Sequence, residues 1–354
     1  AAILVDYKTA EVLAAVGSAD FFNEKIDGQV DGTAALRSPG SALKPFIYAL
    51  ALDQGLIHPR TMLKDVPKNY GLYTPENFDR SFYGLVNATQ ALVYSRNIPA
   101  VDLLLRLEEN SFYQMLEKAG VKKLKTPGYY GLALALGGAE VSAQDLAALY
   151  AMLGNGGKFR PLRWRKDEPQ LPETAMLSPE AAFLTLDMLS YNAPVDRRRL
   201  PFAKRSGTPY KVYWKTGTSY GYKDAWAAGL FGDFVLVVWV GNFDGTPNPA
   251  FTGREAAAPL FFRLVRQIAA GRGIAGDSIR PDGLNLSQAD ICAATGDLAD
   301  AYCPQTVKSY FIPGVTRIKL SGVSRRIPIE VASGLRACRH TPPSTRLETY
   351  DFWP

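Results

Sequence analysis

The sequence predicts an α+β fold, in which one antiparallel sheet made from both ends of a main domain is covered by helices, with a separate helical lobe inserted. Strand-like segments lie within residues 1–18 and 211–242, and helical spacing of apolar residues dominates the stretch between them. The composition changes near Gly271, after which short strand-like segments, prolines and all three cysteines follow. We therefore expect a main domain at residues 1–270 and a small, β-rich extension of uncertain fold at residues 271–354.

The N-terminal part of the chain contributes strands first and then a helix. Residues 1–18 predict two strands around a polar turn, and a polar loop leads from them to Gly40. Residues 41–54 predict a helix, because apolar side chains recur there at helical spacing (Leu43, Phe46, Ile47, Leu50 and Leu52). Pro45 lacks an N–H and disfavours helical geometry at Lys44, so we expect an irregular first turn.

The middle of the chain predicts three further helices. Residues 99–118 have helical spacing. Ser142 is a typical N-cap for a helix over residues 143–153, which the glycine-rich run at 154–157 ends. A serine followed by a proline opens another helix over residues 178–190.

The pattern changes back to strands after this helical region. Three consecutive strands are predicted at residues 212–219, 224–231 and 234–242. Gly221 and Gly232-Asp233 supply the turns between them. Residues 256–270 return to helical spacing and end the main domain.

Composition limits the class of protein. The 354 residues are 47% apolar and 21% charged, so the chain can bury a proper core. The formal charge of +6 is mild, and basic runs such as Arg197-Arg198-Arg199, which we expect in an exposed loop, lack the interleaved aromatics of a nucleic-acid site. No stretch approaches the ~20 apolar residues of a membrane-spanning helix. Because neither an initiator Met nor a signal peptide is present, we expect a soluble mature piece or fragment of an anchored protein.

Histidines and cysteines are few. The two histidines, His58 and His340, lie in a loop-like stretch and in the tail. A serine enzyme with this sequence therefore needs a base other than histidine, and no zinc site is expected. The three cysteines, at positions 292, 303 and 338, do not form a C-x-x-C motif. A disulfide between two of them would leave the third cysteine unpaired.

The first candidate catalytic motif is Ser41-Ala42-Leu43-Lys44. Residues at i and i+3 near a helix start share a face, so the amine of Lys44 can reach the hydroxyl of Ser41. A serine becomes a nucleophile when a base removes its proton, and a lysine can be that base if burial and a second cation lower its pKa. The helix N-terminus also offers N–H groups to a developing oxyanion. The alternative interpretation is an ordinary capped helix.

The second candidate motif is Ser95-Arg96-Asn97, just before a predicted helix. The Ser95 hydroxyl can relay a proton, and the Asn97 amide can bind a peptide carbonyl. Alternatively, these residues cap the helix. A similar triplet, Ser190-Tyr191-Asn192, stands at a predicted helix end. We favour Ser95, because a loop-to-helix junction presents side chains outward.

The third candidate motif is Lys215-Thr216-Gly217-Thr218, on the first strand of the second half. Lys215 supplies positive charge to a substrate carboxylate and lowers the pKa of Lys44. The hydroxyls of Thr216 or Thr218 can bind that carboxylate, and the Thr218 N–H can complete an oxyanion hole. Gly217 would let a substrate backbone approach the strand closely. The alternative is a strand end with a solvated lysine.

Ser-x-x-Lys, Ser-x-Asn and Lys-Thr-Gly in this order form the motif set of penicillin-binding proteins and serine β-lactamases. The sequence resembles bifunctional class A penicillin-binding proteins, especially the 1C type, over residues 1–270. The segments that carry the likeness are residues 37–46, 76–79, 132–138, 141–142, 214–220, 223–226, 253 and 256–259. The resemblance implies the penicillin-binding-protein/serine β-lactamase-like fold. One departure, Thr9-Ala10-Glu11 where the family often has Thr-Gly-Glu, affects only a turn.

The resemblance also implies a reaction. Ser41 attacks a D-alanyl-D-alanine stem peptide of peptidoglycan, Lys44 takes its proton, and Ser95 relays a proton to the leaving D-alanine. Asn97 holds the donor peptide, and Lys215 and Thr218 hold its carboxylate, beside Thr216 and Gly217. An amine of a neighbouring stem, expected to be diaminopimelate, resolves the acyl-enzyme, and β-lactams acylate the same serine. No metal or organic cofactor is implied.

The family's usual setting gives further expectations. Its members carry an N-terminal membrane anchor and a glycosyltransferase domain, both outside this sequence. We therefore expect the periplasmic face of a bacterial inner membrane, with contact to the membrane only through that anchor and with other cell-wall-synthesis proteins as partners.

Three alternatives stay open at this point. A serine β-lactamase shares the motifs, but between Asn97 and Lys215 no convincing Glu-x-x-Leu-Asn element follows, and the second motif is not Ser-Asp-Asn. A D,D-carboxypeptidase differs only in its acceptor. A non-catalytic sensor or scaffold could keep the fold and bind penicillin or wall peptide.

Overall fold

The computed structural model describes residues 1–71, 73–109, 111–193, 210–276, 282–337 and 345–351. The run Arg197–Arg199, Cys338 and His340 lie outside these ranges. None of the described helices is both long and apolar enough to span a bilayer.

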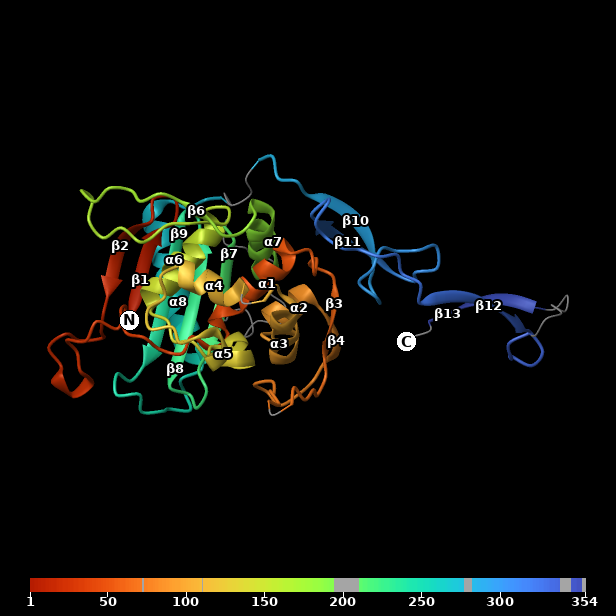
Figure 1. Cartoon of the computed structure of the whole chain (residues 1–354), viewed down its shortest axis with the longest axis horizontal. Helices are drawn as coiled ribbons and strands as arrows, with labels where there is room; N and C mark the ends of the chain where they lie inside the picture. Colours follow the sequence, from red (N-terminus) through yellow and green to blue (C-terminus); the bar gives the residue numbers. More distant parts are fainter. Residues whose placement is uncertain (72, 110, 194–209, 277–281, 338–344, 352–354) are drawn as a thin grey trace.

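A five-stranded antiparallel sheet in the order β2-β1-β9-β8-β7 forms the centre of the main domain (Figure 1). Its strands are β1 (Ala2–Asp6), β2 (Glu11–Val16), β7 (Val212–Thr218), β8 (Asp224–Phe231) and β9 (Phe234–Gly241). The N-terminal β1 pairs with β9, which places Val5 opposite Val235. The prediction of one sheet built from both ends of the domain is therefore confirmed.

Helices cover both faces of this sheet. Side chains of β8 alternate between the faces, so Trp226 and Ala228 belong to one hydrophobic core, whereas Ala225 and Ala227 belong to the other. Helix α6 (Ala143–Gly154) packs on the first face. On the second face lies α8 (Ala258–Arg272), which follows a π-helical turn, η5 (Gly253–Ala257), and covers Trp214 of β7.

A lobe rich in helices lies beside the sheet, next to β7 in Figure 1. It contains the 3-10 segments η2 (Gly40–Leu43) and η3 (Gly131–Leu136), helices α1 (Lys44–Asp53), α2 (Ala88–Val93), α3 (Asn97–Arg106), α4 (Ser111–Lys118), α5 (Pro127–Tyr130) and α7 (Pro179–Ser190), and the strand pair β3 (Met62–Asp65) and β4 (Gly84–Asn87). The expected irregular turn at Ser41 is the 3-10 segment η2. A short pair, β5 (Lys158–Phe159) and β6 (Thr174–Ala175), follows α6.

The prediction of one helix over residues 99–118 is wrong. Helix α3 begins earlier, at Asn97, and ends at Arg106, after which Leu107 adopts an extended conformation. The following Glu108-Glu109-Asn110 offers no apolar side chain to continue the buried stripe. Helix α4 then starts at Ser111 and returns Phe112 to the same core as Leu107.

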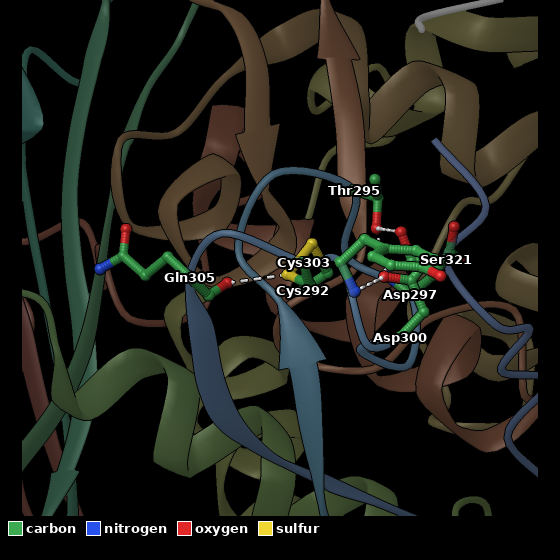
Figure 2. The surroundings of a disulfide bond; sticks show 8 residues. Cys292, Thr295, Asp297, Asp300, Cys303, Gln305 and Ser321 are labelled. Atoms are coloured by element: carbon green, nitrogen blue, oxygen red, sulfur yellow. Dashed lines mark hydrogen bonds between the residues drawn. A yellow bond between two sulfur atoms is a disulfide. The ribbon is translucent and has the colours of Figure 1, made fainter. Parts of the chain in front are cut away.

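The C-terminal extension consists of two hairpins. The first is formed by β10 (Ser287–Cys292) and β11 (Thr306–Phe311), and the second by β12 (Ser324–Glu330) and β13 (Thr345–Asp351). A disulfide joins Cys292 and Cys303, whose Cα atoms are 5.7 Å apart (Figure 2). Figure 1 shows the β12–β13 hairpin projecting away from the main domain.

Candidate active site

Ser41 is held against the end of β7 by close packing of the turn that carries it. A methyl group added at Gly40 would lie 2.2 Å from the carbonyl oxygen of Thr218. Gly40 also has a φ of +51°, which glycine adopts at little cost. On the other side of the turn, the Tyr150 hydroxyl of α6 donates a 2.9 Å hydrogen bond to the carbonyl of Ala42. The position of Ser41 therefore depends on the sheet and on α6 together.

Lys44 is fully buried at the start of α1. Its Nζ donates hydrogen bonds to the carbonyl oxygens of Ser95 (2.8 Å) and Arg96 (3.2 Å) and to Oδ1 of Asn97 (2.5 Å). Within the described residues it makes no hydrogen bond to Ser41 Oγ. Burial lowers the pKa of Lys44 well below its ordinary value, and the positive charges of Lys215 and Arg96 lower it further. Lys44 therefore loses its proton far more readily than an exposed lysine.

The second motif lies at the junction between α2 and α3. Ser95 has a φ of +61°, and α3 begins two residues later. The capping alternative is not what the structure shows, because the N-cap of α3 is Arg96 and no side chain caps the helix. Instead, the Ser95 hydroxyl accepts a hydrogen bond from Lys215, and the Asn97 side-chain amide donates one of 2.6 Å to the carbonyl of Glu76.

Lys215 is buried on β7 and completes the cluster. Its Nζ donates hydrogen bonds to Ser95 Oγ (2.8 Å) and to the carbonyl of Thr216 (3.0 Å). Burial lowers the pKa of Lys215 to about 7, and the charge of Arg254 contributes to this shift. Both lysines thus meet at Ser95, Lys44 at its carbonyl and Lys215 at its hydroxyl.

The remaining residues of the third motif lie beside the Ser41 turn. A methyl group at Gly217 would lie 2.1 Å from the carbonyl oxygen of Pro39, so packing within the chain already requires a glycine there. An approach of substrate backbone at Gly217 stays a prediction. Thr216 and Thr218 alternate with it on the strand, and Thr218 Oγ1 accepts a 2.9 Å hydrogen bond from the N–H of Gly253. The hydroxyl hydrogen of Thr218 can therefore be donated to a ligand oxygen.

Two known protein families match the chain. The penicillin binding protein transpeptidase domain matches residues 1–265, and the penicillin-binding protein 1A C-terminal domain matches residues 281–316. The chain belongs to the penicillin-binding protein transpeptidase family. The resemblance inferred from the three motifs, and the fold that it implied, are confirmed.

Individual relatives agree with the family assignment. The chain is 34% identical over 364 residues to penicillin-binding protein 1C of Escherichia coli (strain K12), covering 100% of the chain and 46% of that protein. It is 28% identical over 316 residues to penicillin-binding protein 1A of Neisseria lactamica, covering 80% of the chain and 37% of that protein. The crystal structure of penicillin-binding protein 1A from Haemophilus influenzae superposes with a TM-score of 0.73 at 22% identity, covering 91% of the chain and 54% of that structure. The chain thus spans less than half the length of these curated relatives.

Some residues of this penicillin-binding domain escaped the sequence analysis. Asp65, Asn77 and Asp79 surround the second motif and bind Arg96 or Asn97. The segment at residues 76–79 carried part of the resemblance, but no chemical pattern in it indicated a contact with the second motif. Asp65 lies on β3, whose strand was not predicted.

The rejected triplet at residues 190–192 has a structural place. The Asn192 side chain donates a 3.2 Å hydrogen bond to the carbonyl of Trp214, and the Trp214 indole donates one of 3.0 Å to the carbonyl of Asn192. Asn192 is itself buried. This pair ties the end of α7 to β7 just before Lys215 and gives Asn192 a structural role.

Proposed function

We propose that this chain is a serine-type D-alanyl-D-alanine transpeptidase, which cross-links peptidoglycan through an acyl-enzyme on Ser41. The family of the domain is one of transpeptidases. The observation that carries the finer proposal is the convergence of two buried lysines on Ser95, one of them three residues after Ser41. That arrangement supplies a base, a proton relay and a positive charge without any histidine.

Acylation begins with Lys44 in its neutral form. Lys44 takes the proton of the Ser41 hydroxyl, and Ser41 Oγ attacks the penultimate D-alanine carbonyl. Backbone N–H groups at the Ser41 turn and at Thr218 stabilise the oxyanion, since Gly40 brings these two segments into contact. Lys215 and the hydroxyls of Thr216 and Thr218 bind the terminal carboxylate.

The departure of D-alanine and the attack of the acceptor amine each need a proton transfer. The proton on Lys44 passes to the Ser95 hydroxyl, which Lys215 holds in place, and that hydroxyl gives its own proton to the amine of the departing D-alanine as its C–N bond breaks. Asn97 meanwhile binds the donor peptide through the second hydrogen of its side-chain amide, since the first is donated to the Glu76 carbonyl. An acceptor amine, which we propose to be diaminopimelate of a neighbouring stem, then forms the new C–N bond, and Ser41 recovers its proton as its ester bond breaks.

The wider setting is part of the same proposal. Residues 1–270 form the catalytic domain and residues 271–354 form a separate small extension. We propose a location at the periplasmic face of a bacterial inner membrane, where an anchor outside this sequence holds the protein near other cell-wall-synthesis proteins. β-Lactams, whose carboxylate and reactive carbonyl resemble those of the donor, acylate Ser41.

Intact mass spectrometry after incubation with a penicillin tests the nucleophile. We expect a stable one-to-one adduct that maps to the Ser41 peptide and is absent from Ser41→Ala. Ser95→Ala should acylate slowly, whereas the matched control Ser190→Ala, in the rejected triplet, should acylate normally. Penicillin that is consumed without an adduct would instead indicate a β-lactamase.

The acceptor is tested with a D-alanyl-D-alanine donor peptide and a diaminopimelate amine. A cross-linked amide product supports the transpeptidase, and a hydrolysed donor alone indicates a D,D-carboxypeptidase. Efficient penicillin acylation with neither product would favour a penicillin-binding sensor.

A further inference from the structure

The backbone at Ser95 is held in a conformation that a serine rarely adopts. Its φ of +61° lies in the left-handed region, where the backbone of a non-glycine residue is strained. The N–H groups of Ser95 and Arg96 bind the carbonyls of Leu92 (3.1 Å) and Ala91 (2.9 Å), as expected at a helix end. Such a turn persists only where its surroundings hold it, and it presents two successive carbonyls to Lys44.

The side chain of Arg96, the residue after Ser95, is fixed by its surroundings. It is buried, and its Nε donates a 2.7 Å hydrogen bond to Asp65 Oδ2, while Nη1 donates one of 2.9 Å to Asp79 Oδ2. Its Nη2 donates to the carbonyl of Ser81. The Tyr83 ring covers the guanidinium, with the ring centroid 4.1 Å from Cζ. All three nitrogens and one face of the group are therefore in use.

A second connection runs from the same carboxylate to Asn97. Asp65 is fully buried on β3 and accepts a 2.7 Å hydrogen bond from the side-chain amide of Asn77. The Asn77 Oδ1 in turn accepts a 2.7 Å hydrogen bond from the backbone N–H of Asn97. Asp65 thus anchors both Arg96 and Asn97, the residues that supply two of the three acceptors of Lys44.

We propose that Arg96 is a positioning residue for acylation: clamped by Asp65 and Asp79, it fixes the left-handed Ser95 turn that places the acceptors of Lys44 and the hydroxyl bound by Lys215. This inference rests on the proposed function, because it assigns Arg96 a part in the acylation of Ser41. Arg96 touches no reacting atom and acts through Ser95 and Lys44. An arginine is suited to this place because its fork reaches three acceptors in different directions, which a lysine cannot do.

The same ion pair also sets the charge around Lys44. The charged groups that face Lys44 are Lys215 from β7, Arg96 from the turn before α3 and Asp65 from β3. The two cations lower the pKa of Lys44, and Asp65 raises it. Tyr48, one turn along α1 and close to Asp65, stays neutral because burial raises its pKa. Removing Arg96 or Asp65 should therefore move the pKa of Lys44 in opposite directions.

The experiment measures acylation by a fluorescent penicillin from pH 5 to 10, together with thermal unfolding, for Arg96→Gln, Arg96→Lys and Asp65→Asn. Arg163→Gln is the matched control, because it removes a half-buried arginine paired with Glu11, far away on β2. We expect the first-order acylation step to fall about tenfold or more in Arg96→Gln, as for a lost charged hydrogen bond. The affinity for the uncleaved penicillin should change less, and the control should acylate normally.

The pH profiles separate positioning from general loss of stability. The acid limb of the curve of acylation rate against pH should move to higher pH in Arg96→Gln and to lower pH in Asp65→Asn. Arg96→Lys should keep the wild-type limb and still acylate slowly, because it retains the charge and loses the fork. The proposal would be overturned if Arg96→Gln acylates at the wild-type rate with the wild-type acid limb. It would also be overturned if the acid limb moves in the same direction in Arg96→Gln and Asp65→Asn.

A second measurement does not depend on the reaction. Hydrogen exchange of a peptide spanning residues 92–103 should become faster in Arg96→Gln and stay unchanged in Arg163→Gln. If the wild type fails to acylate, the proposed function fails, and this exchange alone decides whether Arg96 holds the turn. Unchanged exchange in Arg96→Gln would then contradict the inference.

Discussion

At the scale of single residues, the candidate site contains two lysines that the fold buries at a cost. A buried ammonium loses its hydration, and only part of that loss is recovered by the acceptors around Lys44 and Lys215. The depressed pKa of each lysine expresses this cost. Chemistry that needs a neutral amine and a nearby positive charge therefore works against the stability of the domain.

The variant Lys215→Met should show directly that the buried charge of Lys215 lowers the stability of the domain. The pKa of Lys215 falls from 10.5 in the unfolded chain to about 7 in the fold, so between these values the unfolded state binds more protons. The free energy of unfolding of the wild type should therefore rise from pH 7 to pH 10, relative to Lys215→Met, by an amount on the order of a few kcal/mol. Urea unfolding at the two pH values measures it, and parallel pH curves for the two proteins would contradict the expected burial of the charge.

At the scale of elements, the contact between η2 and β7 determines where Ser41 lies. Two glycines, Gly40 and Gly217, make the contact, and each faces a carbonyl oxygen of the opposing segment. The contact fixes the Ser41 turn to the strand that carries Lys215. It joins residues more than a hundred positions apart in the sequence, so it depends on the formation of the whole sheet.

Gly40→Ala tests this contact. The added methyl would meet the carbonyl of Thr218 at 2.2 Å, and the left-handed φ would be strained as well. We expect a loss of about 2–4 kcal/mol in the free energy of unfolding and a large loss of penicillin acylation. Gly120→Ala is the matched control, because its φ of +75° is similar but its methyl would meet nothing within 4 Å. It should lose only about 1 kcal/mol, and equal losses in both variants would show that backbone strain alone matters.

The sequence predicted local features of these elements well. Helix spacing placed Ser41 and Lys44 one turn apart, and alternation with turn residues gave the strands β7, β8 and β9 nearly to their ends. The break at Leu107 escaped prediction, because apolar residues on both sides share one core. The Arg96–Asp65 pair also escaped, because it joins a helix junction to a strand 31 residues earlier and depends on tertiary packing.

At the scale of the whole molecule, the extension packs on two parts of the main domain. These are the residues just after α1 and the helix α7. The Arg317 N–H donates a 3.0 Å hydrogen bond to the carbonyl of Gly55, and Asn285 N–H donates one of 2.8 Å to Glu180 of α7. The Phe183 and Tyr310 rings meet edge to face nearby. These contacts give the first hairpin of the extension a defined place, which sequence patterns could not supply.

His58 lies at the centre of this packing and makes it dependent on pH. Its Nε2 lies 2.9 Å from the carbonyl of Gly296, so Nε2 carries a hydrogen, and Nδ1 accepts a 3.3 Å hydrogen bond from the N–H of Arg60. Protonation would add a hydrogen at Nδ1, where the Arg60 N–H already donates and where Ser309 Oγ of β11 lies 3.2 Å away. Burial lowers the pKa of His58 from 6.5 to about 4, although the hydrogen bond to the Gly296 carbonyl raises it.

Acid should therefore loosen the extension before it unfolds the main domain. Between pH 6.5 and 4 the unfolded or undocked state binds the extra proton, so docking loses stability as the pH falls, by an amount on the order of a few kcal/mol. Hydrogen exchange at pH 7 and pH 4.5 should show peptides of β10 and β11 losing protection at the lower pH, while β8 keeps its own. His58→Gln retains a donor for Gly296 and cannot titrate, so at pH 4.5 its extension should exchange more slowly than that of the wild type. Equal loss of protection in both proteins would assign the effect to other groups, and equal loss in β8 and β11 would mean that the two parts unfold as one unit.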